Sequence, residues 1–355
     1  MRGWKGLMAS VAIATVCGSA AASAEMKGAS FTYVGSWSGL TLYKQFEQPF
    51  WGKTLPEDSK GKIKVEVTTF DQMGLKGAEV YRILAKNVFD IGATVADYTV
   101  ADAPEVEGLD IPMLAQDPAT AKKVAMAYKP VLDEAFGKRF DAHVLAVVPY
   151  PGQILFCNAE IKGLSDLKGL KVRSSGGSAA EFLNAVGAES VTMAFSEVPG
   201  ALQRGVIDCA VTGSLSGYSS GWHEVSKVLY PMPMGGWDDV VTAISLKKWN
   251  SLDKETQAFL TKEVADKFET PAWEAANEDS QQGVACLTGT GEPACKHGKP
   301  GTMKLVPVSD ADVAMARKLL TEKVLPNWAS RTDAAYVTKW NDTVGKVVGL
   351  TAKKP

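Results

Sequence analysis

Short apolar runs and amphipathic stretches alternate along the first 150 residues. The segment Ile63-Lys64-Val65-Glu66-Val67 alternates with a period of two, which is typical of a strand with one buried face. Longer stretches between the apolar runs have helical periodicity. The pattern predicts strands over residues 30–36, 63–69, 89–95 and 143–148, and helices over residues 43–54, 77–86 and 119–135. This order favours an α/β fold with mostly parallel sheets and helices on both faces.

The alternation restarts after Pro149-Tyr150-Pro151-Gly152, which indicates a second lobe. Leu252 to Gln282 is charged, has helical periodicity, and is long enough to brace both lobes. We expect a two-lobed periplasmic binding protein fold with its ligand cleft between the lobes, where hinge closure can occur. The predicted elements of the second half are strands over 153–158, 170–173 and 209–212 and helices over 178–186, 196–204, 310–324 and 333–348. The expected division is residues 25–149 plus about 238–282 for lobe I, and 150–237 plus about 283–355 for lobe II.

The N-terminus has the features of an export signal. Two positive charges in Met1-Arg2-Gly3-Trp4-Lys5 precede the apolar run Leu7 to Val16, and Ala22-Ser23-Ala24 forms an Ala-x-Ala cleavage site. An apolar run of about ten residues is half of the roughly 20 that a membrane-spanning helix needs. We therefore predict a signal peptide over residues 1–24, cleavage before Glu25, and a periplasmic location.

Composition narrows the classes of partner. Loss of Arg2 and Lys5 with the signal changes the formal net charge from -2 to -4. A mildly acidic chain argues against a nucleic-acid partner, which would favour clustered basic residues. No motif indicates a cofactor, so none is expected.

Four cysteines remain after cleavage, and an even number suits an oxidising compartment. Cys286 and Cys295 flank a segment rich in Gly and Pro, which predicts a loop closed by a disulfide. A metal site is not supported, because no second Cys/His pair has the spacing of ligands. Cys157 and Cys209 either form a second bridge or are two buried thiols, and the sequence leaves both open.

The segment Leu167 to Glu181 contains the clearest local signal for a ligand site. A strand ends at Arg173 and a helix starts near Ser178, with Gly and Ser residues in the turn between them. Backbone N–H groups in such a turn can face an anion, and a guanidinium binds a carboxylate bidentately. Alternatively, Ser178 only caps the helix and Arg173 lies on the surface.

The run from Val191 to Asp208, which contains Met193-Ala194-Phe195-Ser196-Glu197-Val198, resembles the solute-binding subunits of tripartite ATP-independent periplasmic (TRAP) transporters. The Leu-Lys-Gly-Leu-Lys-Val-Arg segment that ends at Arg173 belongs to the same pattern. The resemblance implies capture of a small carboxylate between two lobes and its delivery to membrane permease subunits. It also implies that Arg173 pairs with the ligand carboxylate and that Phe195 packs on the ligand.

Two positions depart from the pattern of many acid-binding members. Gln153 stands where a second Arg is common, and Thr212 stands where an Asn is common. An amide keeps hydrogen-bonding capacity but carries no charge. The departures favour a ligand with one carboxylate, or with a hydroxyl or carbonyl group in place of a second anionic group.

Aromatic residues at predicted strand and loop ends are further candidates for the site. Trp37 and Trp237 would suit an aryl or aliphatic acid, although ordinary packing explains such residues as well. Asp97 and Tyr98, just beyond the third strand, are weaker candidates.

Two other functions remain as alternatives. A secreted hydrolase would need a catalytic set, but His143 and His223 accompany no Gly-x-Ser-x-Gly, His-Glu-x-x-His or phosphate-loop motif. We therefore predict that the chain is not an enzyme. A periplasmic sensor module that presents its ligand to a signalling receptor would have the same sequence features as a transport receptor.

Overall fold

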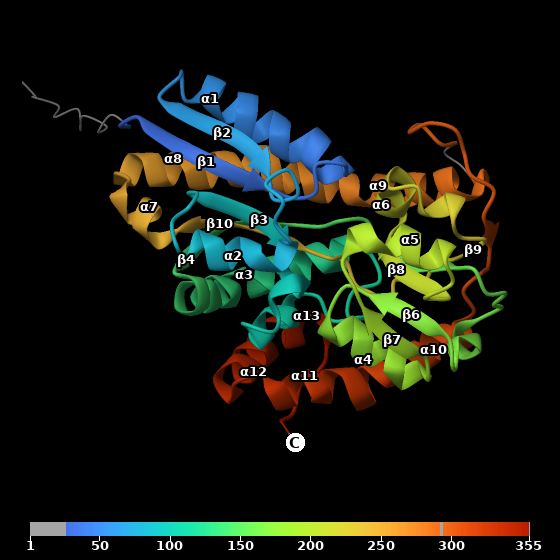
Figure 1. The fold of residues 1–355 in the computed structure, drawn as a ribbon. Coiled ribbons are helices and arrows are strands. Elements are labelled where there is room, and N and C mark those ends of the chain that lie inside the picture. Colours follow the sequence, from blue (N-terminus) through green and yellow to red (C-terminus); the bar gives the residue numbers. More distant parts are fainter. Residues whose placement is uncertain (1–25, 292–293, 355) are drawn as a thin grey trace, which may run out of the picture.

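Two β-sheets form the framework of the fold (Figure 1). The computed structural model describes residues 26–291 and 294–354, so the predicted signal peptide lies outside the described residues. The first sheet has the order β2-β1-β3-β10-β4, with β1 Ala29–Gly35, β2 Ile63–Thr69, β3 Ile91–Val95, β4 Ala142–Val148 and β10 Val240–Ser245. The second sheet has the order β11-β9-β5-β8-β6-β7, with β5 Gln153–Cys157, β6 Lys171–Ser174, β7 Glu189–Thr192, β8 Cys209–Gly213, β9 Val228–Tyr230 and β11 Lys304–Leu305.

Both sheets are mixed. Five of the nine strand pairings in the described residues are parallel and four are antiparallel. The antiparallel pairings all involve β5 or β10, and each of these strands follows a crossing of the chain from one sheet to the other. The α/β fold with two sheets is confirmed. The sequence predicted mostly parallel sheets, whereas only slightly more than half of the pairings are parallel.

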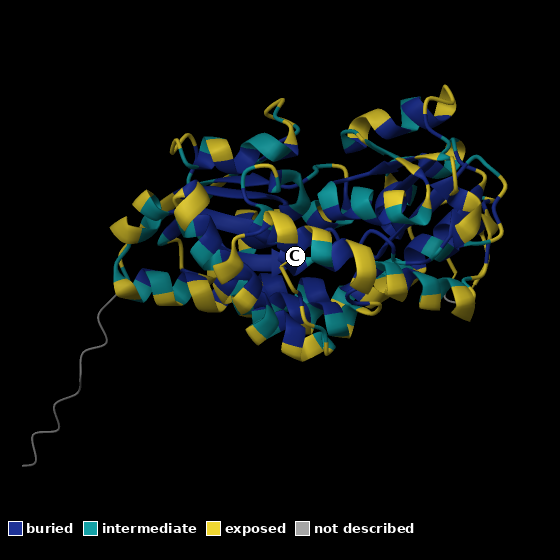
Figure 2. Ribbon diagram, turned by 90° about the horizontal axis from the view of Figure 1, so that it is seen from below, coloured by how far each residue is buried: buried dark blue, intermediate teal, exposed yellow. Residues whose placement is uncertain are grey.

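Strands of the first sheet differ in how far their residues are buried. Strand β2 lies at an edge, and its residues alternate between buried and exposed positions as the sequence predicted. Strands β3 and β10 lie inside the sheet and are buried along their whole length. Figure 2 shows the buried strands enclosed by helices whose outward turns are exposed.

Helices cover both sheets. Helix α3 begins at Pro118 because the Asp117 carboxylate accepts a hydrogen bond from the Thr120 N–H at 2.8 Å and so caps the helix. The segment predicted to be helical over residues 43–54 is helical, mostly with π-type winding, and continues into α1. The helices before the long C-terminal region are α1 Leu55–Asp58, α2 Val80–Leu84, α3 Pro118–Phe140, α4 Gly177–Val186, α5 Val198–Gln203, α6 Ser214–Ser219 and α7 Leu246–Ser251.

One long helical segment connects the two sheets. Helix α8 Lys254–Val264 continues through a π-helical turn, Ala265–Glu269, into α9 Thr270–Thr288. The indole of Trp273 donates a hydrogen bond to the Val147 carbonyl of β4 at 2.8 Å, and the far end of α9 packs against α6, which follows β8. The helix thus braces both sheets, as the sequence predicted (Figure 1).

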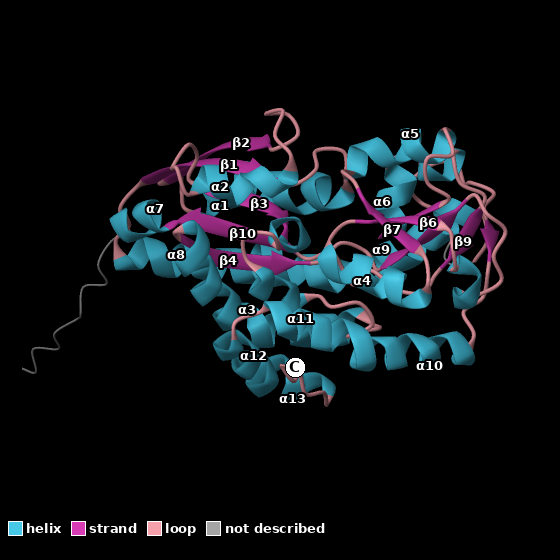
Figure 3. Cartoon of the chain, turned by 60° about the horizontal axis from the view of Figure 1, so that its bottom comes forward, coloured by secondary structure: helices cyan, strands magenta, loops and turns pink. Residues whose placement is uncertain are grey.

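The C-terminal helices cross beneath both sheets (Figures 1 and 3). They are α10 Asp310–Leu319, α11 Leu325–Arg331, α12 Ala334–Trp340 and α13 Lys346–Val348. Helix α10 packs against α4 of the second sheet, whereas α12 and α13 pack against α3 of the first sheet. This region therefore contacts helices on both sides of the molecule.

Two disulfides are present. Cys157–Cys209 links the paired strands β5 and β8, and Cys286–Cys295 ties the end of α9 to the loop that follows it. The second bridge was predicted, and the first resolves the alternative that the sequence left open. Within residues 26–291 and 294–354, no helix has both the length and the apolar character needed to cross a membrane.

Candidate functional site

A cavity of about 860 Å³ lies between the two sheets. Its lining residues follow the carboxyl ends of strands from both sheets. Trp37, Asp71 and Asp97 come after β1, β2 and β3, whereas Ser175 and Phe195 come after β6 and β7. This is the crevice in which open α/β sheets bind their ligands.

Aromatic rings form one wall of the cavity. The rings of Trp37 and Phe195 come from different sheets, yet their centroids are 5.5 Å apart. Trp37 also packs edge-on against Phe70 at 4.7 Å, and Phe195 stacks on Trp222 at 5.2 Å. The structure thus brings two of the predicted site residues together, each fixed from behind by a second ring.

Arg173 lies beneath the cavity wall. Its side chain is 1% exposed, so the surface position that the sequence left open is excluded. The guanidinium donates from Nε to the Met193 carbonyl at 3.1 Å and from Nη1 to the Val211 carbonyl at 2.8 Å. Nη2 is buried and has no hydrogen-bond partner among the described residues. Arg173 itself does not line the cavity, but Met193, whose carbonyl it binds, and Ser175, two residues further along the chain, do.

The turn between β6 and α4 already holds two carboxylates of the protein. Glu107, from the first-sheet side, accepts a hydrogen bond from the Ser178 N–H at 2.7 Å and pairs with Arg331. Asp97 accepts a hydrogen bond from the Ser175 hydroxyl at 3.0 Å. Gly176, not Ser178, is the N-cap of α4. The Ser178 N–H, which the sequence suggested for a ligand anion, therefore binds Glu107 instead.

Gln153 and Thr212 are buried and do not line this cavity. Gln153 begins β5, and its side-chain nitrogen donates to the Pro151 carbonyl at 2.8 Å. Its backbone N–H donates to the Gly236 carbonyl at 2.9 Å, which joins the two segments that cross between the sheets. Thr212 lies within β8 opposite Ile154.

Trp237 lies in the second crossing segment. Its backbone N–H donates to the Asp110 carboxylate at 2.7 Å, and its indole donates to the Ala115 carbonyl at 3.0 Å. The ring lines a separate cavity of about 340 Å³, together with Gly152 and Ser280. The structure therefore does not bring Trp237 to the cavity that Trp37 and Phe195 share.

Four aspartates interact electrostatically with one another near the crossing segments, and of these only Asp97 lines the cavity and was named from the sequence. Burial raises the pKa of Asp238 to about 6, although the Arg173 guanidinium counteracts part of the shift. Burial also raises the pKa of Asp110 to about 7, against hydrogen bonds from the N–H groups of Trp237 and Asp238. The pKa values of Asp97 and Asp239 are raised well above the ordinary value, again chiefly by burial. The sequence feature that could have indicated Asp238 and Asp239 is that they are consecutive and lie directly before the apolar run of β10.

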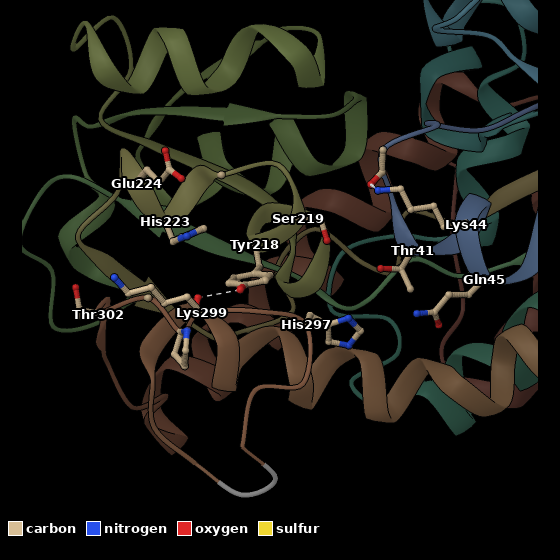
Figure 4. Close-up of a pocket in the computed structure, with 14 residues that line it drawn as sticks. Thr41, Lys44, Gln45, Tyr218, Ser219, His223, Glu224, His297, Lys299 and Thr302 are labelled. Carbon is tan, nitrogen blue, oxygen red and sulfur yellow. Dashed lines mark hydrogen bonds between the residues drawn. The ribbon is translucent and has the colours of Figure 1, made fainter.

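A second cavity of about 850 Å³ contains none of the predicted ligand-binding residues. Figure 4 shows its side chains, with Tyr218 and His223 on one segment and His297 and Lys299 on another. The Tyr218 hydroxyl donates to the Lys299 carbonyl at 2.9 Å, and its ring stacks on His223 at 4.9 Å. In the part of the chain that the structure describes, no group of three or more His, Cys, Asp or Glu residues could hold a metal ion.

Comparison with known proteins identifies the family. Residues 37–290 match the DctP family, the bacterial extracellular solute-binding protein family 7. Three solved structures are similar in fold. DctP6 of Bordetella pertussis, a solute receptor binding pyroglutamic acid, is 24% identical, with a TM-score of 0.75 over 90% of this chain and 100% of that one. A TRAP solute-binding protein of Desulfovibrio salexigens with bound orotic acid is 19% identical, with a TM-score of 0.78 over 90% and 99% of the two chains.

The third is the ectoine-binding protein of the TeaABC TRAP transporter of Halomonas elongata, which is 17% identical, with a TM-score of 0.78 over 91% of this chain and 100% of that one. The family match covers the strands from β2 to β10 and the long helix, and includes every residue that lines the cavity between the sheets. The chain therefore belongs to the DctP family of bacterial extracellular solute-binding proteins.

Proposed function

We propose that this protein is a periplasmic receptor that captures a small monocarboxylate and delivers it to the membrane permease of a TRAP transporter. The observation that carries the proposal is the buried Arg173 guanidinium, whose Nη2 has no partner among the described residues. A buried donor of this kind gains a charge-assisted hydrogen bond when a carboxylate binds. Its single positive charge suits one carboxylate better than two.

The cavity suits a compact ligand with an apolar or aromatic body. Trp37 and Phe195 offer ring surfaces from opposite sheets, and Met193 lies beside Arg173. The similar structures that bind pyroglutamic acid, orotic acid and ectoine support a small carboxylate of this size. In this arrangement, Arg173 would hold the charged end while the rings cover the body of the ligand.

Capture would occur through closure of the two sides over the ligand. Two polar contacts join them across the cavity, from Asp97 to Ser175 and from Glu107 to Ser178. Water can replace such contacts when the sides separate, so closure can be reversible. Closure would then exclude water from the carboxylate and strengthen its interaction with Arg173. The proposal contains no catalytic step.

Substitution of Arg173 tests the proposal. We expect Arg173→Lys to weaken binding of the best ligand from a panel of monocarboxylates by about 2–5 kcal/mol, or roughly 30- to 4,000-fold. Lysine keeps the charge but loses the planar fork. Arg204 is exposed and does not line the cavity, so Arg204→Lys is the matched control.

Isothermal titration calorimetry measures the affinities, and circular dichroism checks that each variant is folded. An unchanged affinity in a folded Arg173→Lys variant would refute the assignment of Arg173 as the carboxylate receptor.

A further inference from the structure

The cavity between the sheets has more acidic than basic side chains. Asp71, Asp97 and Glu197 line it, against Lys76 as the single basic lining residue. Arg173 lies beneath the wall, but Asp238 lies near it and interacts with it electrostatically. A ligand that brings only a carboxylate would therefore add negative charge beside Asp97 and Asp238, whose raised pKa values show that negative charge is already unfavourable here.

Two carboxylate oxygens in this site are buried without a partner. They are Oδ1 of Asp97 and Oδ1 of Asp238, and neither accepts a hydrogen bond from any described residue. The Ser175 hydroxyl donates to Asp97 at 3.0 Å and also lies near enough to Asp238 to lower the pKa of that carboxyl. A hydroxyl has one proton, so it can donate to only one of the two carboxylates at a time. The two carboxylates can therefore accept more hydrogen bonds than Ser175 can donate.

The unpartnered donor and the unpartnered acceptors occur at the same place. The Arg173 guanidinium lowers the pKa of Asp238, and the charge of Asp238 raises the pKa of Asp97. Nevertheless, Nη2 of Arg173 and Oδ1 of Asp238 each lack a hydrogen-bond partner within the described chain. Buried polar groups are almost always hydrogen-bonded. The unpaired donor and the unpaired acceptors therefore point to one ligand that carries both an acceptor and a donor.

We propose that the ligand is a zwitterion, whose carboxylate binds Arg173 and whose N–H-bearing cationic nitrogen binds Asp97 and Asp238. This inference rests on the carboxylate receptor proposed above and specifies the chemical class of its ligand. A zwitterion has no net charge, so it enters the cavity without adding negative charge there. Its nitrogen supplies the donors that Ser175 alone cannot, and charge-assisted bonds of this kind are among the strongest in proteins.

Pairs of acids that differ only in their nitrogen test the proposal. Suitable pairs are proline with cyclopentanecarboxylate, leucine with 4-methylpentanoate, and phenylalanine with 3-phenylpropionate, each titrated calorimetrically into the mature protein. We expect the amino acid of the best-binding pair to bind on the order of 10- to 100-fold more tightly than its nitrogen-free partner. Tighter binding of the nitrogen-free acid in that pair would overturn the proposal.

Two variants separate the role of the nitrogen from that of the carboxylate. Asp238→Asn keeps the shape of the side chain and should remove most of the preference for the amino acid, without weakening the nitrogen-free acid. Asp71→Asn is the control in the same cavity, because the Asp71 carboxylate is already bound by the N–H and hydroxyl of Ser38, at 3.1 and 2.6 Å. It should leave most of the preference intact. An unchanged preference in Asp238→Asn would contradict the assignment of the nitrogen to this residue.

The remaining outcomes distinguish this inference from the proposed function. If only nitrogen-free acids bind, and Arg173→Lys abolishes their binding, the carboxylate receptor stands and the zwitterion is wrong. If nitrogen-free acids bind only when calcium is added, the aspartates hold a metal cation rather than the nitrogen of the ligand, which also overturns the inference. If no acid binds, or Arg173→Lys has no effect, both the receptor and the inference fail.

Discussion

Helices α6 and α9 approach each other most closely at Gly283, where a side chain would not fit. A Cβ at this position would lie 2.3 Å from both the Leu215 backbone nitrogen and the Ser214 hydroxyl oxygen. Alanine normally stabilises a helix by about 0.5–1 kcal/mol relative to glycine. Overpacking typically costs about 1–3 kcal/mol, and a backbone atom cannot rotate away as a side chain can. We therefore expect Gly283→Ala to lower the free energy of unfolding by about 1–2 kcal/mol.

Gly137 in α3 is the matched control. A Cβ there would have only the Ala142 carbonyl oxygen within 4 Å, at 3.9 Å. Gly137→Ala should therefore stabilise the protein by about 0.5–1 kcal/mol. Urea unfolding followed by circular dichroism measures both variants. If Gly283→Ala were as stable as the Gly137→Ala variant, the close contact between α6 and α9 would be refuted.

Three further predictions concern the cavity, a buried carboxyl and a disulfide. Gly176→Ala would place a Cβ about 2 Å from the Asp97 carboxylate, so we expect it to hold the two sides apart and to weaken ligand binding at least about tenfold in calorimetry; unchanged affinity would contradict closure at this contact. Burial raises the pKa of Glu47 to about 7, so its contribution to stability is present at low pH and is lost as the pH rises through 7. Glu47→Gln should thus have little effect near pH 4.5 but raise the free energy of unfolding by up to about 3 kcal/mol at pH 8, and equal effects in urea titrations at the two pH values would refute it. Replacing Cys157 and Cys209 by alanine should lower that free energy by about 2–4 kcal/mol, more than loss of the bridge with the shorter loop; the reverse order in thermal unfolding would contradict the loop-length argument.

The sequence predicted best the elements that have one exposed and one buried face. Strand β2 was predicted over its full extent because Lys64 and Glu66 are exposed and alternate with buried or partly buried apolar residues. Strand β10 was missed, because a strand buried on both faces has an apolar run without alternation. The long helix was predicted over Leu252 to Gln282, because its polar face is exposed along much of its length, and it ends six residues later at Thr288.

Of the residues that line the cavity, Trp37 was named from its place at the end of a predicted strand and Phe195 from the family resemblance. Trp37 and Phe195 follow strands of different sheets, and the rule that ligands bind beyond the carboxyl ends of strands places them at one cavity. Gln153 and Trp237 belong to the crossing segments, where hydrogen bonds to Gly236 and Asp110 fix their positions. These partners are tertiary contacts, which local sequence does not specify.

The environment of α4 shows why a local motif is an incomplete guide to a ligand. The turn before this helix has the composition of an anion site, and an anion does bind there, but it is the carboxylate of Glu107. Glu107 is 71 residues away from Ser178 in the sequence and is held in turn by Arg331, 224 residues further along. The motif indicated the chemistry of the turn correctly and could not indicate which carboxylate would satisfy it.

The distribution of strong and weak links is consistent with a receptor that opens and closes. Neither disulfide spans the cavity, since one joins β5 to β8 and the other closes a loop at the end of α9. Across the cavity, the joining contacts are the hydrogen bonds of Asp97 and Glu107 and the ring contact between Trp37 and Phe195. Water can replace the hydrogen bonds, and a ligand body can replace one ring as the partner of the other. If Arg173 binds the ligand carboxylate as proposed, this contact would shift the population toward the closed form, because it forms only when both sides enclose the ligand.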